Sequence, residues 1–211
     1  MRRFTTSPTR SFILGMAFFL GMATTQAMAQ ADALTFAQRT ADTAIEELTD
    51  KGLTAFQRVE RMQEMIDTTF DVNAVSTFVL GPYASQATAE ELREFKRLYR
   101  VYVAHNYAGL FTRYSNVKVK MTRETKRPDG DTIVDGTIRQ SDGTQADLRM
   151  QLRPTDNSFK AVDLYVEGVS MPLTHRKQFS SIIRQQGGSV KGLISALDRL
   201  VGRLQQASTS P

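Results

Sequence analysis

Cysteine and tryptophan are absent from this chain of 211 residues, and histidine occurs only twice. Without cysteine we expect no disulfides, thiol nucleophile, thiolate metal ligand or lipid-bearing N-terminal cysteine. His105 and His175 lie seventy residues apart, which leaves little material for a zinc site or a Ser-His-Asp triad. The nucleophile elbow G-x-S-x-G, the P-loop, G-x-G-x-x-G and H-E-x-x-H are also missing. These absences predict a protein that is not an enzyme and that uses no metal or cofactor.

Long apolar runs are equally scarce, and the clearest one lies near the N-terminus. Residues 12–20 form a short apolar core, preceded by Arg2, Arg3 and Arg10 and followed by the small-x-small sequence of residues 27–29. This order is typical of a secretory signal peptide, and the run is too short for an ordinary membrane span. The sequence therefore predicts a signal peptide over residues 1–29, cleaved after Ala29, and a location in the periplasm.

Positive charge is only slightly in excess. The whole chain holds 27 basic and 22 acidic residues, a net charge of +5. Three of the basic residues and no acidic ones belong to residues 1–29, so the 182 residues from Gln30 hold 24 basic and 22 acidic residues, a net charge of +2. No dense run of Lys and Arg remains to follow a phosphate backbone. Nucleic acid is therefore excluded as a partner.

The first part of the mature chain, residues 32–112, is predicted to be helical. Thr54 with Gln57, and Thr88 with Glu91, have the spacing of capping boxes, in which each side chain satisfies a backbone amide of the first helical turn. Apolar residues recur at helical spacing after both boxes. The predicted helices cover residues 33–48, a segment opened by Thr54, residues 71–80 and residues 89–111.

The middle of the chain changes to a period of two. Apolar and polar residues alternate along residues 117–122 and again along residues 145–152, which indicates antiparallel strands with one buried face. Turn residues such as Pro128-Asp129-Gly130 separate the runs. The pattern predicts a four-stranded meander over residues 116–126, 131–140, 144–153 and 158–167.

Helical spacing returns after the sheet. Thr174 is predicted to cap a helix that runs to Gln185, and Ser189 opens another after Gly187-Gly188. The end of the chain, residues 206–211, is polar and is expected to be a loose tail. Helices before and after an antiparallel sheet predict an α+β domain over residues 30–205. Composition leaves two interiors open: a solid core, or a slot between sheet and helices that admits a hydrophobic ligand.

The junction between the last strand and the next helix is the most distinctive stretch. Residues 159–170 read FKAVDLYVEGVS, and residues 175–179 read HRKQF. Upstream, Phe70-Asp71, Leu80-Gly81 and the Thr88 helix start follow in order. Over about residues 32–204, these elements resemble the MlaC or toluene-tolerance family.

The chain departs from that family at several positions. Phe159 stands where the family often has Trp, and Tyr83-Ala84 follow the Leu-Gly pair where a Trp is common. His175 occupies a position where Tyr often precedes the Arg, and Met171-Pro172 replace aliphatic residues. These changes keep apolar or aromatic character. They therefore affect which hydrophobic ligand is preferred more than whether a ligand is carried at all.

The resemblance implies a periplasmic carrier of single phospholipids. Its implied partners are an outer-membrane lipoprotein–porin complex and an inner-membrane ABC transporter complex, and its implied role is to maintain outer-membrane lipid asymmetry. Two acyl chains of about 15 methylenes each represent roughly 24 kcal/mol of burial. Leaving five methylenes exposed to water would cost about 4 kcal/mol of binding free energy, nearly a thousandfold in affinity. A carrier therefore needs an enclosing apolar slot with one polar mouth for the head group.

The candidate lipid-binding residues come from the sheet, the long helix and the last strand–helix junction. Arg176 is the candidate for the head group, because a helix N-terminus with an added guanidinium suits a phosphate; the alternative is an ordinary salt bridge, for example with Glu167. The full set is Tyr99, Tyr102, Val103, Tyr107, Phe111, Val134, Ile138, Leu148, Met150, Val166, Val169, Arg176, Phe179, Ile182 and Ile183. Each apolar member is equally compatible with plain core packing.

Three other functions stay open. A related carrier would take a polycyclic lipid such as a hopanoid. A ligand-free adaptor of an envelope transport complex would use the basic helix side formed by Arg93, Lys96, Arg97 and Arg100. A hydrolase would use Ser170 as nucleophile and His175 as base, although five residues across a strand–helix junction is not a recognised arrangement for such a pair.

Overall fold

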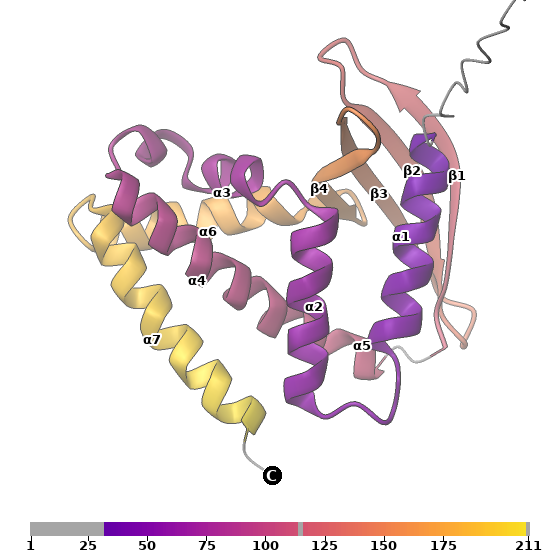
Figure 1. Ribbon diagram of the computed structural model, residues 1–211, viewed down its shortest axis with the longest axis horizontal. Helices are drawn as coiled ribbons and strands as arrows, with labels where there is room; N and C mark the ends of the chain where they lie inside the picture. The colour runs from indigo at the N-terminus through magenta and orange to yellow at the C-terminus, as the bar shows by residue number, and fades with distance from the viewer. Residues whose placement is uncertain (1–31, 114–115, 210–211) are drawn as a thin grey trace, which may run out of the picture.

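The computed structural model describes residues 32–113 and 116–209 and shows an α+β fold (Figure 1), as predicted. The predicted signal peptide lies outside the described residues. The elements in chain order are α1 (Ala33–Leu48), α2 (Ala55–Thr69), α3 (Val72–Leu80), a 3-10 helix η1 (Gly81–Ser85), α4 (Ala89–Ala108), α5 (Leu110–Arg113), β1 (Lys118–Lys126), β2 (Thr132–Arg139), β3 (Gln145–Pro154), β4 (Phe159–Val166), β5 (Val169–Ser170), α6 (Met171–Gln185) and α7 (Val190–Thr209).

Two capping boxes begin α2 and α4 as predicted. The Gln57 amide donates to the Thr54 hydroxyl at 3.1 Å, and the Thr54 amide donates to the Gln57 side chain at 3.0 Å. The Glu91 amide and the Thr88 hydroxyl form the same bond at 3.1 Å, and the Thr88 amide donates to the Glu91 carboxylate at 2.8 Å. Each box satisfies two backbone amides, so both helix starts are determined locally.

The sheet is an antiparallel meander in the order β1-β2-β3-β4-β5. It contains the four predicted strands and a fifth, β5, so the prediction of four strands was wrong by one. Val169 pairs with Val166, and Ser170 pairs with Tyr165. Glu167 and Gly168, both at positive φ, turn the chain back between the two strands. A two-residue strand is too short to show a period of two in the sequence.

The start of α6 corrects a second prediction. The Ser170 hydroxyl accepts a hydrogen bond from the Leu173 amide at 3.1 Å, so Ser170 is the N-cap and the helix begins at Met171. Thr174, the predicted cap, lies inside the first turn, and its hydroxyl donates to the Ser170 carbonyl oxygen at 2.8 Å. Pro172 fits at the second helical position, because its missing N–H would be unpaired there in any case.

Two further boundaries differ from the sequence prediction. The long helix is interrupted at Gly109, which separates α4 from the short α5. At the other end of the chain α7 continues to Thr209, so residues 206–209 are helical rather than part of a loose tail. Polar residues alone do not end a helix, and residues 203–209 contain neither Gly nor Pro.

Helix α1 covers part of the inner face of the sheet (Figure 1). Ala33, Ala37 and Ala41, four residues apart, are buried against strand residues that include Val134 and Leu152. Alanine side chains let the helix approach the sheet closely, and here the solid-core interpretation is correct. We call the buried residues around these contacts the sheet cluster: Ala33, Ala37, Ala41, Met121, Val134, Leu148, Met150, Leu152, Phe159 and Ala161.

The other helices form a second body beside the sheet (Figure 1). Its main core, which we call the bundle cluster, joins α3, α4, α6 and α7 through buried residues such as Phe95, Leu98, Phe179 and Leu193. A smaller cluster, the α2–α4 cluster, consists of Val59, Met62 and Ile66 of α2, Ala104 and Ala108 of α4, and Leu48 at the end of α1. Within the described residues, no helix is both long and apolar enough to cross a membrane.

Candidate functional site

The two bodies meet along a seam, which we define as the zone where α1 and the inner face of the sheet approach α2, α4 and α6. They are joined directly at several points: the Asp71 amide donates to the Ala161 carbonyl oxygen at 2.9 Å, the Lys160 ammonium donates to the Asp67 carbonyl oxygen at 3.1 Å, and Phe70 packs against both the sheet cluster and the bundle cluster. The α2–α3 junction is thus tied to β4.

Large apolar side chains beside the seam keep part of their surface exposed. On the sheet side, Phe36, Ile138 and Val166 pack against the sheet cluster but are only half-buried. On the helical side, Met65, Val103, Tyr107 and Phe111 pack against the α2–α4 cluster and are also half-buried. These side chains therefore leave some apolar surface uncovered along the seam.

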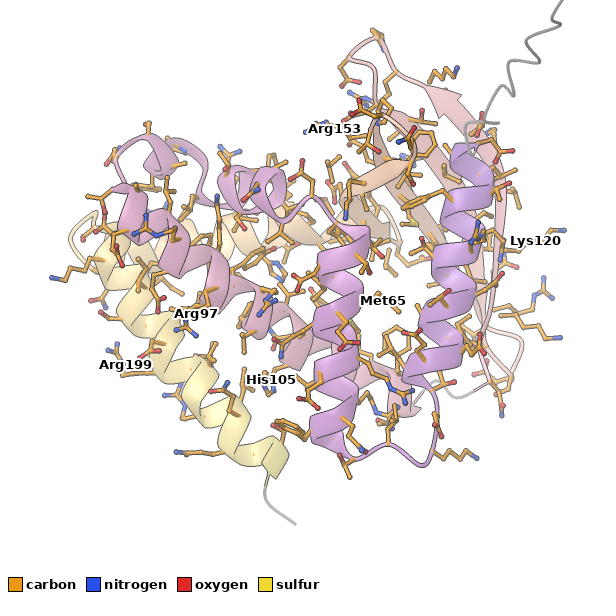
Figure 2. All side chains as sticks on the ribbon, in the orientation of Figure 1. Met65, Arg97, His105, Lys120, Arg153 and Arg199 are labelled. Carbon is orange, nitrogen blue, oxygen red and sulfur yellow. The ribbon has the colours of Figure 1, made fainter. Side chains whose placement is uncertain are left out.

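A hollow of about 440 Å³ opens between α1 and α2 at this seam. Figure 2 shows Met65 on the side of α2 that faces α1. The hollow combines Phe36 and Met65 with a polar rim of hydroxyl and charged side chains. Its lining is Thr35, Phe36, Arg39, Thr40, Thr43, Glu47, Glu64, Met65, Thr68, Thr69 and Ser158.

A second hollow of about 430 Å³ lies on the far side of the bundle, between α4, α6 and α7. Its lining is mainly apolar and consists of Tyr102, Gln178, Phe179, Ser181, Ile182, Leu193, Ala196, Leu197 and Leu200. Both volumes fall within the range of ordinary small-molecule sites.

The structure distributes the predicted lipid-binding residues over three places. Val103, Tyr107, Phe111, Ile138 and Val166 lie beside the seam. Three more, Tyr102, Phe179 and Ile182, line the second hollow. The rest of the apolar set lies in closed core or on the surface: Val134, Leu148 and Met150 in the sheet cluster, Tyr99 and Ile183 in the bundle cluster, and Val169, which is 51% exposed.

His175 organises a hydrogen-bonded aromatic group at the sheet end of α6. Its Nδ1 lies 2.9 Å from the Tyr99 hydroxyl, and its Nε2 lies 3.1 Å from the Tyr107 hydroxyl. The Tyr107 hydroxyl also donates to Sδ of Met171 at 3.4 Å. The imidazole stacks on Phe179 with ring centres 6.1 Å apart. The sequence predicted these tyrosines as lipid-binding residues, but only the fold shows that their hydroxyls converge on this imidazole.

Burial determines the protonation of this group. It lowers the pKa of His175 to about 4, so the imidazole is uncharged at neutral pH. Burial also raises the pKa of the Tyr107 hydroxyl, which therefore stays protonated. A neutral imidazole has one donor and one acceptor nitrogen, so it accepts from one tyrosine and donates to the other.

Ser170 and His175 do not form a nucleophile–base pair. The Ser170 hydroxyl donates to the Asp163 carboxylate, with its oxygens at 2.8 and 3.0 Å, and caps α6. Both nitrogens of His175 already face tyrosine hydroxyls. Burial raises the pKa of Asp163, and the carboxyl group serves the α6 cap.

Arg176 lies beside the α3–η1 junction. Its guanidinium sits over the Phe78 ring, with the central carbon 5.2 Å from the ring centre, and a Cβ added to Gly81 would lie 2.7 Å from its Nε. The predicted alternative partner, Glu167, instead accepts a hydrogen bond from the Asp147 amide. Among residues 32–113 and 116–209, no ion pair of Arg176 is found, so its head-group role stays a prediction.

The basic side of α4 is largely neutralised. Arg93 pairs with Glu90, and Arg97 pairs with Glu94 at 2.6 Å. Arg100 pairs with Asp67 of α2, and the Lys96 ammonium donates to the Asn73 side chain at 2.8 Å. Figure 2 shows Arg97 and Arg199 on neighbouring stretches of α4 and α7. Pairing on this side weakens the case for an electrostatic docking face.

No group of three or more metal-ligating side chains occurs in the part of the chain that the structure describes. A search of curated proteins finds no match for this chain.

Comparison with solved structures shows the fold. The phospholipid-binding protein from Ralstonia solanacearum, solved in complex with a phospholipid, matches with a TM-score of 0.72. It is 21% identical to this chain, and the match covers 83% of this chain and 99% of that one.

The family comparison covers most of the sequence. Residues 38–199 match the family described as MlaC protein. This span runs from α1 to α7 and contains the sheet, the seam and the His175 group. The chain therefore belongs to the MlaC family.

Proposed function

We propose that this protein binds a phospholipid and acts as a carrier rather than as an enzyme. Membership of the MlaC family and the fold shared with a phospholipid-binding protein support this function. The observation that carries the proposal is the seam, where the half-buried apolar residues Phe36 and Met65 line a hollow with a polar rim. This combination suits an amphiphile whose tails are dehydrated while its head group remains in water.

The energy of tail burial requires an enclosing site. Each methylene removed from water contributes about 0.8 kcal/mol, so the binding free energy grows with the length of acyl chain that the site covers. The polar rim, with Arg39, Glu47 and Glu64 among its members, offers charged groups at the surface where a head group would lie. Tails between the two bodies and a head group at the rim of the α1–α2 hollow are the arrangement we propose.

The carrier would work between membranes in the periplasm, after export and removal of residues 1–29. It would exchange single lipids with an outer-membrane complex and an inner-membrane ABC transporter complex. The net charge of +2 after export leaves the protein close to neutral, which limits nonspecific attraction to either membrane surface.

Lipid content after native purification tests the function. The protein, expressed with its full N-terminal segment and purified from the periplasmic fraction without detergent, should contain one diacyl phospholipid per chain by native mass spectrometry. Phospholipid should also be taken up from vesicles by the delipidated protein. A chain that is empty as purified and takes no lipid from vesicles would contradict the proposal, and bound hopanoid in place of phospholipid would reassign the cargo.

A further inference from the structure

We propose that the outer face of the sheet, the face that α1 does not cover, docks electrostatically on an anionic phospholipid surface and leaves the proposed lipid site uncovered. The inference rests on the proposed function only for the choice of partner, because a lipid carrier has to work beside membranes.

The strand register places most charged side chains of the sheet on its outer face. Val134 and Met150 pair with each other and are buried in the sheet cluster, so the residues that alternate with them point outwards. We call the outward charged residues of β1, β2 and β3 the basic face. Its members are Lys118, Lys120, Arg123, Arg139, Arg149 and Arg153, with the carboxylates Asp135 and Asp147.

Carboxylates neutralise only part of the basic face. Asp135 serves two cations at once, with Nη2 of Arg123 at 2.9 Å and Nε of Arg149 at 2.7 Å. Asp131, which directly precedes β2, pairs with Arg153 at 3.1 Å. Six basic residues therefore stand against three carboxylates, an excess of three positive charges. The chain from Gln30 has a net charge of only +2, so its positive excess is concentrated on this face.

The β1 side of the basic face contains like charges in direct opposition. Lys118 pairs with Arg139 across the two strands, and Lys120 follows two residues along on the same face. Arg139 donates to the Gln145 side chain at 3.1 Å, and among the described residues none of these three cations has an ion pair. Figure 2 shows Lys120 pointing outwards from β1. Like charges directly opposite destabilise a sheet, and an anionic surface outside the chain would relieve that repulsion.

The composition of the basic face favours a lipid surface over a protein. Protein interfaces usually have an apolar and aromatic centre. The exposed large apolar side chains of the described residues lie outside the basic face: Phe56, Phe78, Val169 and Leu173. Ile133 and Tyr165, which share the outer side of the sheet, are half-buried. Long basic side chains without an apolar anchor suit lipid phosphates, which attract Lys and Arg within a Debye length of the surface.

Docking by this face leaves the proposed lipid site open. The sheet cluster and the α1–α2 hollow lie on the inner side of the sheet, opposite the basic face. A membrane held against the basic face would therefore keep the carrier close to the bilayer without covering the hollow.

Sedimentation of the protein as purified with lipid vesicles measures the docking. At about 0.01 M salt, where the Debye length is about 30 Å, the wild-type chain should sediment with vesicles of equal parts phosphatidylglycerol and phosphatidylcholine. It should not sediment with phosphatidylcholine alone, and about 1 M salt, where the Debye length is about 3 Å, should release it.

Charge variants locate the docking face. The double variant Lys118→Gln/Lys120→Gln should bind the anionic vesicles about 25-fold more weakly, about five-fold for each charge removed. The double variant Lys177→Gln/Lys191→Gln removes the same charge from α6 and α7 and should bind as the wild type does. Thermal unfolding should show both variants folded, and loss of the repulsion between Lys118 and Arg139 should leave the first variant at least as stable as the wild type.

A wild-type chain that does not bind phosphatidylglycerol vesicles at low salt would overturn the docking, and an acidic protein would then replace the membrane as the candidate partner of this face. Equal losses in the two double variants would also overturn it, because net charge alone would explain the attraction. Native mass spectrometry of the same proteins tests the proposed function separately. Docking with no lipid ever bound would leave the basic face in place and contradict the carrier function.

Discussion

At the scale of single residues, His175 links stability to pH. Burial lowers its pKa to about 4 in the folded state, whereas the unfolded chain titrates near 6.5. The unfolded state therefore binds more protons between these values, and stability should be complete above about pH 6.5 and fall as the pH drops toward 4. The loss should reach at most about 3 kcal/mol.

Urea unfolding at pH 7 and at pH 5 measures this effect, with His175→Gln as the comparison. The variant lacks the titrating imidazole, so its stability should fall less over the same interval. Asp163 acts in the opposite direction, because burial raises its pKa and protonation relieves a buried charge. A variant that loses as much stability as the wild type would show that other groups cause the acid sensitivity.

Gly81 is a second position where one residue decides local structure. It has φ of +58°, and an added Cβ would lie within 3 Å of the Arg176 guanidinium. Gly81→Ala should destabilise the protein by about 1–3 kcal/mol through backbone strain and this clash. Gly109→Ala is the matched control, because Gly109 has φ of −65° and open space around it; denaturant titration should place it within about 0.5 kcal/mol of the wild type.

At the scale of elements, the start of α6 distinguishes a true cap from a residue that resembles one. Ser170→Ala removes the hydroxyl that accepts from Leu173 and donates to Asp163, and we expect a loss of about 1–2 kcal/mol. Thr174→Ala removes only a bond within the first turn and should cost a few tenths of a kcal/mol. Equal losses in chemical denaturation would argue against Ser170 as the N-cap.

The elements that depend on local chemistry were the ones that sequence patterns predicted well. Thr54 and Thr88 begin their helices with partners three residues away, and the alternation along β1 to β4 reports one buried face. In contrast, β5 exists because Val169 pairs with Val166 across a turn. The choice between Ser170 and Thr174 depends on where that strand ends. Such features follow from pairing and not from periodicity.

At the scale of the whole molecule, a carboxylate introduced into one hollow should reduce lipid uptake, and a carboxylate introduced into the other should not. A carboxylate at Met65, beside the seam, would be dehydrated by an acyl chain in the proposed site. Met65→Glu should therefore reduce lipid uptake from fluorescent phospholipid vesicles at least tenfold. Ala196→Glu places the same group in the α4–α6–α7 hollow and should leave uptake unchanged. The reverse outcome would move the tails to the second hollow.

Composition and local pattern determined that this chain is α+β, that it contains no cysteine and only two histidines, and that it resembles the MlaC family, because these depend on residue types and short spacings. Tertiary structure decided which apolar residues close against α1 in the sheet cluster, such as Val134, and which stay half-buried beside the seam, such as Val103. Core walls and pocket walls use the same residue types, so their difference lies in how far apart the opposing elements stand. That separation is set by contacts between residues distant in the sequence, and a hydrophobicity pattern does not encode it.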